Sequence, residues 1–241
     1  MSRVPDGPLI VGVADRAATL AACAVTPPGR RPFDLVEARV DLFDGQRLDD
    51  AALDACWRLE SSGTPVLVTI RSASQGGRFH QPEPVRLALF RDALQVASWV
   101  DVEDDAPIAA DVARLVASRP GGQLVVSHHD FARTPPLAGL LGVVDRCHAT
   151  SAGAIAKVAT AVGNDADRSV LRDLLAQRPG ATAVIGMGDE AFRVELAAAG
   201  SRLAYGFVGA STAPGQTSAE TLRARLLAAS AAYASRRPRA T

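Results

Sequence analysis

Apolar residues gather in eight short runs along the chain, and the stretches between them mix apolar and charged positions at helical spacing. Short apolar runs are typical of buried strands, whereas an apolar residue at every third or fourth position is typical of a helix. Helices are expected, for example, at 84–96 and 165–177, where Pro84 and Asp165 suit the first turn, and a final helix is expected at about 218–234. We predict strands at residues 9–13, 35–43, 66–71, 99–103, 124–129, 154–159, 183–187 and 203–208.

The strand and helix patterns repeat to the end of the chain, and no linker-like segment divides them. Eight such units in 241 residues match an α/β protein of the (β/α)8 TIM barrel class, formed as one domain over residues 1–241. The arginine-rich tail from about residue 235 is expected to be frayed. A doubly wound open sheet is the alternative, and it is disfavoured because no Gly-x-Gly-x-x-Gly turn follows the first run.

The composition excludes several broad classes of protein. A formal net charge of zero argues against a nucleic-acid binder, which normally carries a basic excess. No apolar run approaches the length of a membrane span, and the first residues do not have the pattern of a signal peptide. The three cysteines lie far apart, which excludes a disulfide framework and a cysteine-based zinc site. We expect a cytoplasmic protein without a nucleic-acid or membrane partner.

Lys157 is the only lysine in the chain, and every other basic residue apart from histidine is an arginine. A lysine amine can lose its proton and attack a carbonyl, whereas an arginine side chain stays protonated. Lys157 also lies in an apolar run, where burial lowers the pKa of an amine and favours a Schiff-base nucleophile. The alternative is a structural lysine that reaches from a strand end to water.

Charged residues alternate along the second predicted strand. Glu37, Arg39 and Asp41 share one face there, and charges on a buried face are costly unless they are paired or functional. A structural ion-pair network in the barrel mouth is the alternative explanation for them. The third strand ends at Arg71 ahead of a flexible Gly76-Gly77 pair.

Further polar residues end the fourth and fifth strands. Asp101 and Glu103 share a face, and we expect them to support neighbouring groups, for example as partners of the arginines. His128 and His129 are adjacent, so their side chains point to opposite faces and at most one enters the barrel mouth. A histidine on the strand beside Lys157 is suited to act as a general base next to a Schiff base. His80 and His148 are not spaced to complete a metal site with this pair.

The last part of the chain contains a loop that is rich in small polar residues. Residues 209–216 read Gly-Ala-Ser-Thr-Ala-Pro-Gly-Gln and follow the eighth predicted strand, the usual place for an anion site in a barrel. Such a loop can bind a phosphate or a carboxylate, and the missing Gly-x-Gly-Ser phosphate cup and the nearby Arg193 favour a carboxylate. The loop is also our candidate for a lid.

Five segments together resemble one family, type I 3-dehydroquinate dehydratase. They are residues 37–41, residues 69–71 with the Gly76-Gly77 turn, residues 127–131 with 134–135, the strand around Lys157, and residues 213–216. The segments occur in the right order over nearly the whole chain. The fold of the family is a (β/α)8 barrel, which agrees with the count of units.

The resemblance implies a mechanism and a set of site residues. Lys157 forms an imine with the C3 ketone of 3-dehydroquinate, and His129 removes a proton from C2 and protonates the departing C1 hydroxyl. No metal or organic cofactor is implied, and the family tends to form homodimers. The implied residues are Lys157, His129 and Gln75 for catalysis, Glu37 and Arg39 for the ring hydroxyls, and Arg193 and Gln216 for the carboxylate, with Arg71 and Thr212 close by.

Three positions depart from the family pattern. Gln75 replaces the usual glutamate beside the histidine, and Phe192 precedes Arg193 instead of serine. Gly12 replaces a frequent serine of the first strand, so we expect one substrate contact to be missing there. Because an amide carries no charge, we expect a lower histidine pKa, and we expect Gln75→Glu to shift the acidic limb of the rate profile upward. A Schiff-base lyase or aldolase for another hydroxy-ketone acid and a catalytically silent binding protein are the alternative functions.

Overall fold

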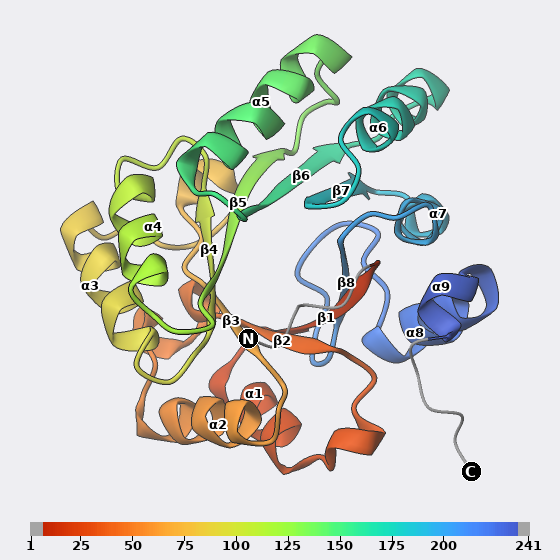
Figure 1. The fold of residues 1–241 in the computed structure, drawn as a ribbon. Helices are drawn as coiled ribbons and strands as arrows, with labels where there is room; N and C mark the ends of the chain where they lie inside the picture. Colours follow the sequence, from red (N-terminus) through yellow and green to blue (C-terminus); the bar gives the residue numbers. More distant parts are fainter. Residues whose placement is uncertain (1–6, 236–241) are drawn as a thin grey trace.

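Eight parallel strands alternate with helices in the computed structural model, which describes residues 7–235 (Figure 1). The strands are β1 Leu9–Ala14, β2 Leu35–Arg39, β3 Val66–Thr69, β4 Trp99–Glu103, β5 Gln123–Asp130, β6 Ile155–Ala161, β7 Thr182–Met187 and β8 Leu203–Phe207. The helices are α1 Ala17–Val25, α2 Asp50–Ser61, α3 Glu83–Ala93, α4 Ala109–Ala117, α5 Leu137–Thr150, α6 Asp165–Gln177, α7 Glu190–Ala198, α8 Ala219–Ala229 and α9 Ala231–Ala234. The expectation of a (β/α)8 barrel is confirmed.

The strands curl into a nearly closed barrel with the helices on its outside (Figure 1). Their order is β7-β6-β5-β4-β3-β2-β1-β8, so the strands from β1 to β7 pair in sequence order and β8 returns to pair with β1. Between β8 and β7 the backbone N–H of Arg202 donates to the carbonyl of Thr182 at 2.9 Å. Since every strand runs in the same direction, all the carboxyl ends gather at one mouth of the barrel.

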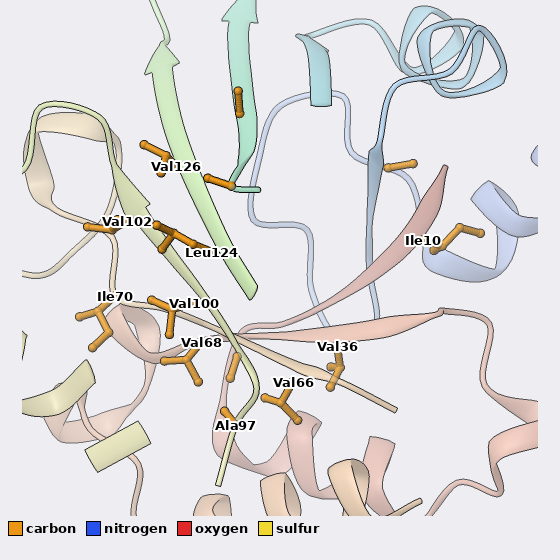
Figure 2. Packing of buried hydrophobic residues seen from close by; sticks show 14 of the residues in the cluster. Ile10, Val36, Val66, Val68, Ile70, Ala97, Val100, Val102, Leu124 and Val126 are labelled. Atoms are coloured by element: carbon orange, nitrogen blue, oxygen red, sulfur yellow. The ribbon is translucent and has the colours of Figure 1, made fainter. Parts of the chain in front are cut away.

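Strand residues alternate between two hydrophobic layers, as the pleat requires. Figure 2 shows the outer layer, in which Val36, Val66, Val68, Val100, Val102, Leu124 and Val126 face the helices. The inner layer fills the barrel with side chains such as Val11, Leu67, Trp99 and Ile155. Each fully buried aliphatic side chain contributes about 1.5–3 kcal/mol, so the apolar layers hold the frame on which the polar groups at the mouth are mounted.

Some boundaries differ from the sequence-based expectation. The fourth strand and the sixth helix have the expected bounds, Trp99–Glu103 and Asp165–Gln177. The second strand is shorter than 35–43, because the chain leaves the sheet after Arg39 and forms a 3-10 turn over Val40–Leu42. The final helix ends at Ala229, and Ser230 begins a separate short helix by accepting a hydrogen bond from the N–H of Tyr233.

Other expectations concern the tail, the cysteines and membranes. Most of the tail expected to fray, including Arg236, Arg237 and Arg239, lies outside the described residues. Cys23, Cys56 and Cys147 are free and buried. None of the helices in residues 7–235 is long and apolar enough to cross a membrane.

Candidate active site

A cavity opens at the barrel mouth, where the carboxyl ends of the strands meet. Its volume is about 540 Å³ with the open mouth included, a size suited to a small metabolite. The residues expected to form the site come from six strands or the segments that follow them, and all of them line this cavity: Glu37, Arg39, Arg71, Gln75, His129, Lys157, Arg193, Thr212 and Gln216. Residues far apart in sequence are therefore brought together as the barrel predicts.

Lys157 points into the cavity from the middle of β6. Its position opposite Ser127 in the β5–β6 ladder puts it on the inner face, and its side chain is 6% exposed. The amine donates a hydrogen bond to Asp101 Oδ2 at 3.1 Å and lies over the ring of Tyr205. Burial lowers the pKa of Lys157, although the Asp101 carboxylate opposes part of that shift. The alternative of a lysine that reaches out to bulk water is wrong.

Asp101 joins the amine to a second buried cation. Its Oδ1 accepts hydrogen bonds from Arg71 Nη2 at 2.8 Å and from the hydroxyl of Ser127 at 2.6 Å. Although burial alone would raise the pKa of Asp101, the charges of Arg71 and Lys157 hold it below the ordinary value. Glu103 lies 3.3 Å from Arg71 Nη1. The two carboxylates of β4 therefore contact the arginine, the supporting arrangement expected from the sequence.

The charged face of β2 is divided between two different sets of contacts. Glu37 accepts a hydrogen bond from the hydroxyl of Thr69 at 2.6 Å. Arg39 makes a two-pronged pair with Asp41, with its Nε and Nη2 atoms 2.9 and 2.8 Å from the two carboxylate oxygens. Asp41 lies in the 3-10 turn, so the expectation of three charges on one strand face is wrong for this residue. The pair holds the Arg39 guanidinium at the cavity wall.

The two adjacent histidines have different surroundings. His129 lines the cavity, and Gln75 Oε1 lies 3.1 Å from its Nδ1 atom and accepts a hydrogen bond from its backbone N–H at 2.9 Å. Burial, followed by the charges of Arg71 and Lys157, lowers the pKa of His129 well below its ordinary value. His128 faces away from the cavity and pairs with Asp104 at 3.0 Å, which raises its pKa. Of the two histidines, His129 is thus the one placed to exchange a proton with a molecule in the cavity.

Arg193 and the 209–216 loop form one side of the mouth. Arg193 Nη2 donates to the carbonyl of Pro214 at 2.8 Å, whereas its buried Nε has no hydrogen-bond partner among residues 7–235. Burial lowers the pKa of Arg193 to about 10. Gln216 Oε1 accepts hydrogen bonds from the N–H and hydroxyl of Thr212 at 2.9 and 3.1 Å. A cation with a free donor beside hydroxyl and amide groups is suited to bind a carboxylate.

The family model of type I 3-dehydroquinase matches residues 21–231 of this chain. The chain belongs to this family. It is 36% identical over 192 residues to the 3-dehydroquinate dehydratase of Methanothermobacter thermautotrophicus, covering 79% of this chain and 82% of the relative. It is 33% identical over 199 residues to the enzyme of the same name from Methanocella arvoryzae, covering 78% and 84%. The resemblance seen in the sequence is confirmed.

Solved structures of the same name have the same fold. The 3-dehydroquinate dehydratase of Geobacillus kaustophilus is similar with a TM-score of 0.75 at 26% identity, covering 93% of this chain and 90% of the other. That of Aquifex aeolicus has a TM-score of 0.78 at 24% identity, with coverage of 91% and 98%. These likenesses support the barrel as the fold of the type I 3-dehydroquinase chain described here.

One departure from the family pattern has no consequence for the cavity. A side chain at Gly12 would point toward the ring of Phe33, 2.6 Å from its Cδ1 atom, and toward Val208 in the outer layer. It is Val13 that lines the cavity from β1. The expectation that glycine at this position removes a substrate contact is therefore wrong, because the alternation of the strand turns residue 12 outward.

Sequence reasoning missed two residues beside the 3-dehydroquinase site. Tyr205 of β8 lines the cavity, and its position on the same face as Leu203 was readable from the strand alternation. Asp105 lies in a turn after β4, where its Oδ1 accepts a hydrogen bond from Gln75 Nε2 at 2.7 Å. No sequence periodicity in a turn indicates such a contact.

Proposed function

We propose that this protein converts 3-dehydroquinate to 3-dehydroshikimate and water through a Schiff base on Lys157. The observation that carries the proposal is a buried amine, the only lysine of the chain, in the same cavity as a histidine with a lowered pKa. Family membership supports the choice of substrate, since the relatives bear the name 3-dehydroquinate dehydratase.

Lys157 supplies the electron sink for the reaction. The neutral amine adds to the C3 ketone, and loss of water gives an iminium whose positive charge makes the C2 proton acidic. Burial favours the neutral amine, while Asp101 at 3.1 Å compensates the positive charge of the iminium. Eliminating a hydroxyl from the β position of the bare ketone would require a much poorer carbanion.

His129 moves the protons. Its lowered pKa keeps the imidazole neutral at neutral pH, so it accepts the C2 proton as a general base. The electron pair of the broken C–H bond forms the enamine, which then expels the C1 hydroxyl. The imidazolium returns its proton to that leaving group, and water hydrolyses the product iminium to release 3-dehydroshikimate and the free amine.

The remaining cavity residues orient the substrate. Arg193 and Gln216 bind the carboxylate with Thr212, because Arg193 has a donor without a partner among the described residues. Glu37 and Arg39 bind ring hydroxyls from β2. Arg71 is engaged with Asp101 and Ser127, so it shapes the cavity wall next to the amine.

Borohydride trapping tests the proposal. The protein is incubated with 3-dehydroquinate in the presence and absence of borohydride, and intact mass and the enone absorbance of the product are measured. The expected result is a reduced adduct on Lys157, located by peptide mapping, together with product when borohydride is absent. An adduct without product would favour a silent binding protein. No adduct with this acid would favour a lyase or aldolase with another substrate.

We further propose that the protein acts in the cytoplasm as a homodimer. Three buried free cysteines suit a reducing compartment. The dimer is an expectation from family resemblance. Light scattering coupled to gel filtration measures it directly, and a monomer at micromolar concentration would contradict it.

A further inference from the structure

A chain of hydrogen bonds runs from the imidazole of His129 to a carboxylate outside the cavity. Gln75 is the middle member, 4% exposed, with its amide oxygen toward His129 and its amide nitrogen toward Asp105. Asp105 itself is exposed and lies in the turn between β4 and α4. The three residues come from three separate segments of the chain, so the contact depends on the tertiary fold.

The orientation of the Gln75 amide follows from its partners. A carboxylate is only an acceptor, so Asp105 requires the amide nitrogen of Gln75. The backbone N–H of His129 is only a donor, so it requires the amide oxygen. Both partners impose the same orientation, and the amide oxygen therefore also faces Nδ1 of the imidazole at 3.1 Å.

We propose that Asp105 is a positioning residue for His129: through the Gln75 amide it holds the imidazole as the tautomer with hydrogen on Nδ1. An acceptor opposite Nδ1 requires the proton there, which leaves the lone pair of Nε2 free to accept the substrate proton. The inference rests on the proposed function in one respect, because that function makes His129 the general base.

This arrangement accounts for the departure at Gln75. The family usually has a carboxylate next to the imidazole. Here the amide of Gln75 contacts the imidazole, and the carboxylate of Asp105 lies on the other side of that amide and acts through it. The hydrogen bond that the Gln75 amide donates to the Asp105 carboxylate polarises the amide and strengthens the bond between its oxygen and Nδ1–H. The groups that face His129 from neighbouring segments are cations, namely Arg71, Lys157 and Arg39, together with its neighbour His128.

The proposal changes what Gln75→Glu is expected to do. A glutamate there would bring a second carboxylate against Asp105, where Gln75 Nε2 and Asp105 Oδ1 are 2.7 Å apart. Two carboxylates so close cannot both be ionised at ordinary cost. The reciprocal exchange Q75E/D105N removes this conflict, because the amide introduced at position 105 would donate to the carboxylate introduced at position 75. That carboxylate would in turn accept from the imidazole.

The first experiment measures the tautomer directly and needs no substrate. The chain has 4 histidines, so protein labelled with 15N-histidine gives few ring signals, and His129→Gln assigns those of His129 by their loss. We expect the neutral imidazole to carry hydrogen on Nδ1. In Asp105→Ala the two tautomers should become mixed, while Asp105→Asn, which keeps an acceptor oxygen, should retain most of the Nδ1–H form.

Asp111→Asn is the matched control. It removes one carboxylate from α4, where Asp111 pairs with Arg114 and is not among the residues that line the cavity, so the His129 signals should not change. A wild-type imidazole with hydrogen on Nε2, or an Asp105→Ala variant with the wild-type tautomer, would overturn the proposal. A loss of stability alone would not move the tautomer.

The second experiment follows turnover of 3-dehydroquinate. Asp105→Ala should lower kcat about fivefold and leave KM within about twofold, the scale of one lost hydrogen bond. Q75E/D105N should be more active than Gln75→Glu, with its acidic limb at higher pH than in the wild type. A double variant no better than Gln75→Glu would count against the relay.

The two experiments separate the two proposals. A tautomer that depends on Asp105 in a protein without turnover of 3-dehydroquinate would refute the proposed function and leave the positioning role intact. Turnover of 3-dehydroquinate by a protein whose His129 tautomer does not depend on Asp105 would refute the positioning role and leave the proposed function intact.

Discussion

The side-chain nitrogen of Lys157 lies 4.4 Å from the centre of the Tyr205 ring. The ring face attracts the ammonium ion, as does the carboxylate of Asp101 at 3.1 Å. Both contacts favour the charged amine, whereas burial favours the neutral amine, and the net effect is a lowered pKa for Lys157. The site thus keeps a buried amine paired at rest and still prepares it to lose a proton.

Tyr205→Leu should lower the pKa of Lys157 further, because the substitution removes the aromatic face and keeps an apolar side chain. Tyr205→Phe keeps the face, so the pKa of Lys157 should stay near that of the wild type. Since the chain has one lysine, lysine labelled with 13C at Cε gives one signal, and its titration reports this pKa. An equal pKa in the two variants would show that the ring does not stabilise the ammonium.

Tyr205→Phe should also stabilise the fold. The hydroxyl of Tyr205 is buried and has no hydrogen-bond partner within residues 7–235. Burying such a group costs roughly 1–3 kcal/mol, so its removal should raise the free energy of unfolding by about 1 kcal/mol. Urea denaturation measures this change, and a decrease of similar size would contradict the assignment of an unpaired hydroxyl.

Substitution of Lys157 separates its charge from its nucleophilicity. Lys157→Arg keeps a cation near Asp101 but cannot form an imine, so kcat should fall on the order of 10⁴-fold or more, as when a catalytic nucleophile is removed. Lys157→Met should lose activity to the same extent and should keep the fold, because Asp101 remains paired with Arg71. Thermal unfolding and turnover are measured together, and an arginine variant within tenfold of wild type would refute the covalent mechanism.

The sequence predicts most of the barrel because its signals are local. Apolar runs define the eight strands, and charges spaced by two on β2 and β4 indicate an inner face that reaches the mouth. The sole lysine was recognisable by composition alone. These signals depend on the pleat and on chemistry, which act wherever a strand forms.

The residues that sequence reasoning misplaced or missed depend on longer-range geometry. Asp41 lies on a 3-10 turn because the chain leaves the sheet to return toward the barrel surface. Asp105 reaches Gln75 only because two loops from neighbouring units approach each other at the mouth. Tyr205 lies in the barrel interior among apolar residues, so its sequence pattern does not distinguish an active-site wall from a core position.

His128 and His129 should show opposite pH effects on stability. The pKa of His128 is raised by Asp104, so its contribution is present below the ordinary histidine pKa of about 6.5 and is lost as pH rises through the folded value. The pKa of His129 is lowered by burial. The unfolded chain therefore binds a proton there first, and stability is lost as pH falls below about 6.5.

Urea denaturation of two variants at two pH values checks these signs. His128→Asn should cost more stability about one unit below the ordinary histidine pKa than about two units above it, with a loss below about 1 kcal/mol for a partly exposed pair. His129→Asn should reduce the loss of stability that the wild type shows on acidification. The same pH trend in both variants would contradict the opposite environments of the two rings.

Gly76→Ala tests the packing of the loop against His129. Gly76 has a φ of 78°, and a Cβ there would lie 2.4 Å from a ring carbon of Phe131, which stacks on His129 with ring centres 6.3 Å apart. Alanine should cost about 1–2 kcal/mol in backbone strain and displace the Phe131 ring. We expect kcat/KM to fall on the order of tenfold, since small displacements at an active site reduce rates.

Gly63→Ala supplies the control, because Gly63 also has a positive φ, 83°, while a Cβ there would meet no described atom within 4 Å. It lies between α2 and β3, at the end of the barrel opposite the cavity. This variant should therefore lose about 1–2 kcal/mol of stability through backbone strain alone and keep the wild-type kcat/KM. Equal kcat/KM in the two alanine variants would mean that Phe131 yields without disturbing His129, and the contact between Gly76 and Phe131 would then have no part in placing the imidazole.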